Sequence, residues 1–189
     1  LLPRLKDIVE WKNLTMEGTV TGKVGVGGIV GKSYIGSTVE NCVSRVKVTG
    51  TGDYVGGVTG GNSYCILRNC RNEGSVEGTG DCVGGVTGIN SSSSTITACY
   101  STGSVTGTDI YGGVVGTNSS STITTCYWQT FGPTDSRPTQ GIGKDDGGTI
   151  TDVNPISSAY TTDGPPAPPA PRPPPRPPPP RRHPHPAHP

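Results

Sequence analysis

The amino-acid sequence predicts an all-β protein, a short β-solenoid of about four repeats of ~28 residues followed by an extended polyproline II tail. One observation is a Gly-Gly pair that recurs at steps of 29, 28 and 28 residues, beginning at Gly27, Gly56, Gly84 and Gly112. Another is a cysteine that recurs at steps of 28, 29 and 27 residues, at Cys42, Cys70, Cys99 and Cys126. The segments between the glycines are also short and rich in Val, Ile and Thr, without the periodicity of a helix.

The composition excludes several other classes of protein. Hydrophobic residues make up 30% of the 189 residues, with a single Phe and a single Met. A doubly wound α/β enzyme or a helical bundle needs long apolar runs or stripes, which the sequence lacks. The net charge of +1 gives no electrostatic reason to expect nucleic acid as a partner, and no apolar run is long enough to span a membrane.

Four segments are expected in chain order. Residues 1–14 cap the first coil, with a short helix after Pro3. Residues 15–128 form the four-repeat solenoid, and residues 129–163 form a C-terminal cap and linker. Residues 164–189 form the tail, because residues 165–189 contain 15 of the 19 prolines and proline fixes φ and lacks an N–H.

Equivalent residues of stacked coils lie about 4.8 Å apart, so each repeated residue is expected to form a column along the stack. The four periodic cysteines are expected to form an inward core column, either as buried thiols or as disulfides between neighbours. The other two cysteines, Cys65 and Cys82, lie off this register and are expected to form a disulfide.

An aspartate stands three residues before each of three Gly-Gly pairs, at Asp53, Asp81 and Asp109. Such side chains commonly accept backbone hydrogen bonds in turns. Calcium bound by the stacked carboxylates is the alternative. No other cofactor and no other metal site are expected.

The repeat unit resembles that of the GLUG family of secreted and cell-surface proteins. The resemblance rests on Gly-Gly-Val-Val-Gly-Thr-Asn at residues 112–118, followed by Ile-Thr-Thr-Cys-Tyr at residues 123–127, and covers about residues 15–150. The first repeat departs from the pattern, with Ser33 where the other repeats have Asn. The resemblance implies an extracellular location and a surface, adhesive or spacer role without catalytic residues.

Three Asn-x-Ser/Thr sequons make Asn13, Asn90 and Asn118 candidate N-glycosylation sites. The repeat offers a second interpretation for Asn90 and Asn118, as turn or column asparagines. The tail resembles the proline-rich rods of hydroxyproline-rich wall glycoproteins. This resemblance implies hydroxylation and O-glycosylation of its contiguous prolines, which are Pro165, Pro166, Pro168, Pro169, Pro173, Pro174, Pro175, Pro177, Pro178, Pro179 and Pro180.

An enzyme is not expected. All three histidines lie in the tail, so the solenoid has no imidazole to act as a base for a Ser or Cys nucleophile. The neighbouring carboxylates Asp145 and Asp146 lie in a Gly-rich stretch that shows no sign of a cleft.

The predicted function is that of a structural subunit of an extracellular glycosylated fibre. A short solenoid has two open ends with unpaired strand edges, which favours a polymer of identical subunits, with the tail docked along its neighbours. The alternative is an adhesin or carbohydrate-binding module on a rigid stalk, with carbohydrate or other surface glycoproteins as partners. Its aromatic candidates are Tyr34, Tyr64, Tyr100, Tyr111, Tyr127 and Trp128, of which Tyr100 and Tyr127 are expected to point outward.

Overall fold

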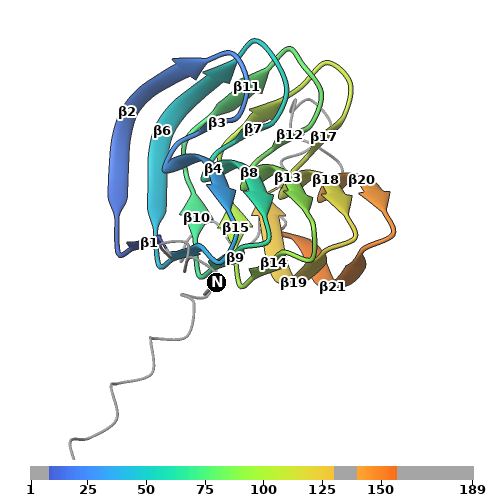
Figure 1. Cartoon of the computed structure of the whole chain (residues 1–189). Coiled ribbons are helices and arrows are strands. Elements are labelled where there is room, and N and C mark those ends of the chain that lie inside the picture. The colour runs from blue at the N-terminus through green and yellow to red at the C-terminus, as the bar shows by residue number, and fades with distance from the viewer. Residues whose placement is uncertain (1–8, 130–139, 157–189) are drawn as a thin grey trace, which may run out of the picture.

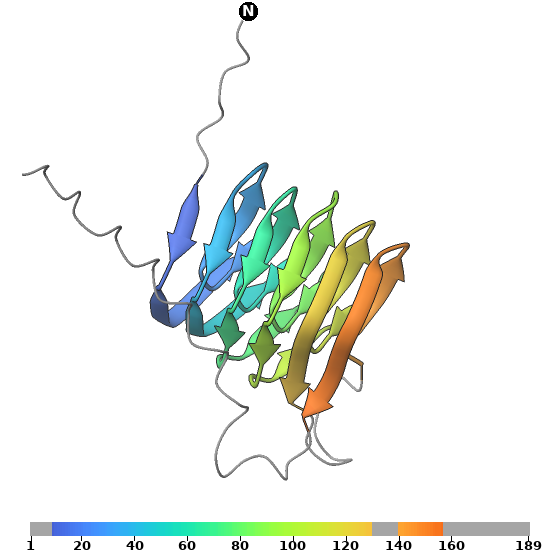
Figure 2. The same ribbon diagram turned by 90° about the horizontal axis from the view of Figure 1, so that it is seen from below.

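The computed structural model describes residues 9–129 and 140–156. These residues form a parallel β-solenoid of about five turns (Figure 1), and the two described ranges contain no α-helix. Strands of successive turns lie side by side in chain order along the stack (Figure 2). The predicted fold class is therefore confirmed for the solenoid. The tail and its proline modifications lie outside the described residues.

Every strand pairs in parallel with the equivalent strand of a neighbouring turn, giving three sheets. One tract of sheet A contains β1 (Glu10–Lys12), β5 (Thr38–Glu40), β9 (Ile66–Arg68), β14 (Thr95–Thr97) and the first parts of β19 (Thr122–Gln129) and β21 (Thr149–Ile156). The rest of sheet A contains β2 (Thr15–Gly22), β6 (Val43–Gly50), β10 (Arg71–Asn72), β11 (Val76–Gly78), β15 (Tyr100–Ser101) and β16 (Val105–Thr106). Sheet B contains β3 (Val26–Gly27), β7 (Val55–Gly56), β12 (Val83–Gly84) and β17 (Tyr111–Gly112). Sheet C contains β4 (Val30–Tyr34), β8 (Thr59–Ser63), β13 (Thr87–Ser91), β18 (Val115–Ser119) and β20 (Ile142–Asp146).

The core consists of columns of aliphatic side chains and thiols. The register of sheet A places Val39, Leu67, Ile96, Ile123 and Ile150 in one column. The four inner members of this column are completely buried, from Val39 to Ile123. A second, smaller cluster of valines fills the space between sheet B and the facing strands of sheet A. Each coil thus covers the apolar side of its neighbour, which a single coil cannot do alone.

The Gly-Gly pairs allow two walls of the coil to approach closely. A Cβ atom on Gly57 would lie 2.2 Å from Cγ of Asn72 and 2.3 Å from the carbonyl oxygen of Gly85. A side chain larger than hydrogen therefore cannot fit at the second glycine without moving the opposite wall. This close approach explains why the pair recurs in each repeat.

A column of left-handed residues turns the corner that precedes each periodic cysteine. Its members have φ between 52° and 56° and are Asn13, Asn41, Asn69, Ala98, Thr125 and Asp152. Asparagine and aspartate tolerate this conformation better than other non-glycine residues. In the first two turns the column is also linked by a 3.3 Å hydrogen bond from Nδ2 of Asn41 to Oδ1 of Asn13.

Both ends of the stack differ from the predicted caps. Residues Glu10–Lys12 form strand β1, paired with β5, where a short helix was predicted, and residues 1–8 lie outside the described ranges. The region predicted to be a C-terminal cap contains β20 and β21, which pair with β18 and β19 and add a further turn. The spacing of the cysteines does not predict this turn, because the residue in register with Cys126 is Val153 and not a cysteine.

Candidate functional sites

A polar column runs through the interior of sheet C and links all five turns. The hydroxyl of Ser33 donates to Oδ1 of Asn62 at 3.0 Å. Each asparagine amide then donates to the next oxygen at 2.9 Å, from Asn62 to Asn90, from Asn90 to Asn118 and from Asn118 to Asp145. The three asparagines are completely buried, so the chain of hydrogen bonds satisfies polar groups that have no access to water.

This column contains the asparagines of two of the three sequons. Nδ2 of Asn90 and Nδ2 of Asn118 would carry the glycan, yet both donate inside the folded core. A sugar on either amide would break the column and separate the turns. These residues follow the second interpretation, that of column asparagines. Asn13 is exposed at a corner of the first turn and remains a candidate N-glycosylation site.

The periodic cysteines form the inward column expected for them. Cys42, Cys70, Cys99 and Cys126 are completely buried in the main core, and all are free thiols. Burial raises the pKa of the Cys99 thiol well above its usual value, because the thiolate would lose its hydration. Cys99 therefore packs as a neutral, apolar side chain.

The predicted Cys65–Cys82 disulfide is not formed in the structure. Sγ of Cys82 lies 3.1 Å from Oγ1 of Thr117, and that threonine is in register with Gly61, by way of Ile89. Sγ of Cys65 donates to the carbonyl oxygen of Ser63 at 3.0 Å, so each of the two thiols has a different partner. Cys65 instead belongs to a corner column of serines, and its backbone N–H donates to Oγ of Ser94 at 3.1 Å.

The repeated aspartates lie at turns before sheet B. A carboxylate oxygen of Asp53 accepts the backbone N–H of Asp81 at 3.0 Å, which joins two successive turns. No group of three or more His, Cys, Asp or Glu side chains in the described ranges is arranged to hold a metal ion. The hydrogen bond of Asp53 is of the kind expected from the turn interpretation, and calcium binding stays an untested alternative.

The two tyrosines expected to point outward differ in exposure, and Tyr127 is half-buried. Tyr100 is only 8% exposed, and its hydroxyl accepts a hydrogen bond of 3.1 Å from Nη1 of Arg71. Trp128 is 5% exposed and packs in the main core. The exposed tyrosines are Tyr34 and Tyr64, which lie at and just beyond the C-terminal ends of β4 and β8.

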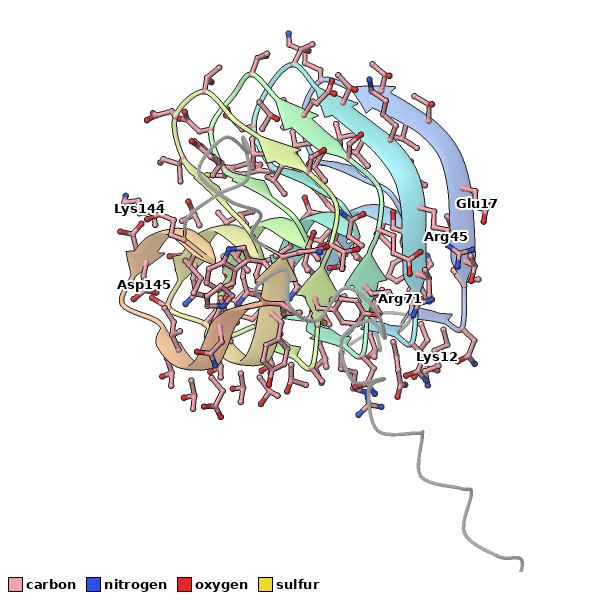
Figure 3. The ribbon with its side chains drawn as sticks, turned by 180° about the vertical axis from the view of Figure 1, so that it is seen from behind. Lys12, Glu17, Arg45, Arg71, Lys144 and Asp145 are labelled. Carbon is pink, nitrogen blue, oxygen red and sulfur yellow. The ribbon has the colours of Figure 1, made fainter. Side chains whose placement is uncertain are left out.

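The side walls near the first turns carry paired charges. Arg45 lies between two glutamates, 3.0 Å from Glu17 and 2.7 Å from Glu73, on the outer surface of β2 and β6 (Figure 3). All three side chains are substantially exposed, so these ion pairs add little stability. They make the wall polar and well solvated.

The two ends of the stack present unpaired strand edges. At the N-terminal end, Leu14 and Met16 are 37% and 43% exposed beside the edge strand β2 and within it. At the C-terminal end, Ile150 of the edge strand β21 is 41% exposed. These side chains belong to the apolar or inward rows of the solenoid, and they are exposed because no further turn covers them among the described residues.

Pro155 occupies the C-terminal edge. Tyr100 and Tyr127 are the residues of the two preceding turns that are equivalent to the residue just before Pro155. The backbone N–H of each donates to a carbonyl of the turn before it. Because backbone groups alternate in direction along a parallel strand, the missing N–H of Pro155 lies on the open side. Proline is one of the devices that weaken pairing at sheet edges.

A shallow hollow of about 180 Å³ lies on the outer face of sheet C near the N-terminal end. Outward residues form a column there, with Lys32, Gly61, Ile89, Thr117 and Lys144 in register. Gly61 leaves a gap in this column, and the ring of Tyr54 flanks the gap from the turn before sheet B. We name this feature the sheet C hollow.

These observations place the protein in the class of parallel β-solenoids built from short repeats with glycine at their corners. The GLUG motif then matches residues 22–49, which confirms the resemblance found in the sequence. The motif is typical of extracellular proteins, and the fold is compatible with an extracellular repeat protein. Searches of curated proteins and of solved structures gave no match. No helix in the described ranges is long and apolar enough to cross a membrane.

Proposed function

We propose that this protein is a structural subunit of an extracellular fibre in which copies stack end to end. The observation that carries the proposal is the pair of ends that the described residues leave open, each with unpaired strand edges and exposed apolar side chains. Unpaired edges are templates for further strands, and burial of the apolar side chains would drive the contact.

The side chains of the two ends are matched in position. The column that ends with Ile150 begins with Trp11, which is in register with Val39. The cysteine column ends with Val153 and begins with Leu14. Leu14 is equivalent to Cys42, because the carbonyl of Leu14 accepts the N–H of Val43 as the carbonyl of Cys42 accepts the N–H of Arg71. A second copy placed in register would continue both columns with apolar residues.

Such a contact joins two different surfaces, so each added copy leaves a new free end. Heterologous contacts of this kind generate open filaments unless the rotation closes a ring. The charged wall around Arg45 favours growth at the ends over lateral aggregation. We propose further that the proline-rich tail, residues 164–189, docks along neighbouring subunits, because a preformed polyproline II segment loses little entropy on binding.

The test compares two isoleucines of almost equal exposure. Ile150 lies at the C-terminal end and is 41% exposed, whereas Ile66 points outward from the middle of the stack and is 43% exposed. Sedimentation and electron microscopy of the full chain should show concentration-dependent assembly for the wild type and for Ile66→Glu. Ile150→Glu should remain monomeric, because a buried unpaired carboxylate is strongly unfavourable.

Two outcomes would contradict the proposal. One is a wild-type chain that stays monomeric at its highest soluble concentration. The other is an Ile150→Glu chain that assembles like the wild type.

The second candidate function is an adhesin or carbohydrate-binding module. A separate observation favours it, the sheet C hollow with its tyrosines and lysine. Because the hollow lies on an outer face and the stacking contact uses the strand edges, either function can fail without the other.

A further inference from the structure

The geometry points to the sheet C hollow as a binding site for a carboxylated sugar, a hexuronate residue of an acidic polysaccharide. This inference rests on the second candidate function, the carbohydrate-binding module, and names its ligand class. It is independent of end-to-end assembly.

The hollow exists because one glycine interrupts an outward column. A Cβ atom on Gly61 would lie 3.5 Å from both Cγ2 of Ile89 and Cγ of Lys32, so these two side chains flank the gap. Two turns further along, Thr117 fills the same position and contacts Cys82. The open part of the surface is therefore confined to the first turns.

The walls of the hollow combine an aromatic ring, a cation and hydroxyl groups. The ammonium of Lys32 lies 5.3 Å from the centre of the Tyr54 ring. Tyr34 is 59% exposed at the rim, and Ser63 and Ser91 add hydroxyls that can donate or accept hydrogen bonds. Aromatic faces pack against the C–H groups of a sugar ring, while the hydroxyls match its polar edge.

The charge of the lysine specifies the kind of sugar. No carboxylate in the described ranges lies within ion-pairing distance of Lys32. A ligand carboxylate would therefore gain a charge-assisted hydrogen bond without displacing a carboxylate of the protein. The volume of about 180 Å³ is small for a drug-like ligand and suits a single sugar ring. Since the hollow is open to solvent, a polysaccharide chain can continue from that ring.

A glycine-filling variant tests the site without disturbing the fold. Gly61 has no positive φ, and its Cβ direction meets only ordinary contacts, so Gly61→Thr fits the strand. Threonine also favours a strand more than glycine does, so the thermal midpoint of this variant should equal or exceed that of the wild type.

The experiment is calorimetric titration of the full chain with an oligogalacturonate and, separately, with the neutral oligogalactose of equal length. The wild type should bind the acidic oligomer more tightly, with an affinity that falls as salt is added. Gly61→Thr should reduce the affinity for the acidic oligomer at least tenfold. Lys32→Gln should reduce it about tenfold and leave the neutral oligomer unaffected. Tyr64→Ala, which removes an equally exposed tyrosine outside the hollow, should bind like the wild type.

Each contrary outcome has a distinct meaning. If neither oligomer binds, both the inference and the carbohydrate-binding function are wrong. If the neutral oligomer binds as tightly and Lys32→Gln changes nothing, the carboxylate specificity is wrong and the carbohydrate-binding function stands. If Gly61→Thr binds like the wild type, the ligand site lies elsewhere.

Discussion

The buried asparagine column makes a quantitative prediction for Asn90→Ala. The substitution leaves the amide donor of Asn62 and the amide oxygen of Asn118 without partners in a dry interior. Each unsatisfied group costs about 1–3 kcal/mol, so the free energy of unfolding should fall by about 2–6 kcal/mol. That loss is a large fraction of the ~5–15 kcal/mol that stabilises a typical domain.

The assay is urea denaturation followed by tryptophan fluorescence, which reports on the buried Trp128. The control is Ser91→Ala, one residue further on the same strand, whose half-buried side chain points outward. We expect the control to change the free energy of unfolding by at most ~0.5 kcal/mol.

A second variant tests the direction of the hydrogen bonds. In Asn90→Asp the new carboxylate still accepts from Asn62 but faces the oxygen of Asn118, to which Asn90 donates in the wild type. Burial and the facing oxygen raise the pKa of the introduced carboxyl group above its value in the unfolded chain, so this variant should become more stable as the pH is lowered. Losses below ~1 kcal/mol for Asn90→Ala, or no acid stabilisation of Asn90→Asp, would refute the role given to the column.

Four further outcomes are expected. Because burial raises the pKa of the Cys99 thiol, its contribution to the free energy of unfolding should be constant below the unfolded thiol pKa of about 8.5 and fall at higher pH. Urea titrations should show a weaker decline above that pH for Cys99→Ala than for the wild type. Peptide mapping of protein secreted from a eukaryotic host should find any N-glycan at Asn13 and none at Asn90 or Asn118, and an occupied Asn90 in folded protein would contradict the structure. Gly57→Ala should lower the thermal midpoint strongly, because its Cβ would overlap the opposite wall, and a neutral effect would show that the walls are not in contact. Pro155→Thr should promote assembly in sedimentation by restoring an N–H on the C-terminal edge, and unchanged assembly would exclude that edge from the contact.

The periodic residues were predictable because stacking constrains them directly. A repeat of 27–29 residues that keeps cysteine and glycine in step fixes both the coil length and the register. The aliphatic column from Val39 to Ile123 follows from the same spacing, because these positions are the inward side of each coil. The expected solenoid and its thiol column could therefore be derived without coordinates.

The candidate sites were less accessible to sequence reasoning. The sequon pattern alone does not reveal whether an asparagine faces water, and Asn90 and Asn118 proved to face the core. The predicted pairing of Cys65 with Cys82 was wrong. Cys65 lies 28 residues after Ser37 and 29 residues before Ser94, and this spacing indicates that it belongs to the column of serines. The fifth turn lacks the cysteine, with Val153 in its place, and so escaped a search based on that period.

The recurrence of like residues at a fixed spacing is enough to specify the parallel solenoid, its period and the identity of its core columns, because in-register stacking requires nothing more. The three-dimensional structure was needed to show which polar residues lie inside, which aromatic rings are exposed and where Gly61 opens a hollow beside Tyr54. These features depend on how the coil bends at its corners and on which wall faces which. Spacing along the chain does not encode the path of those bends.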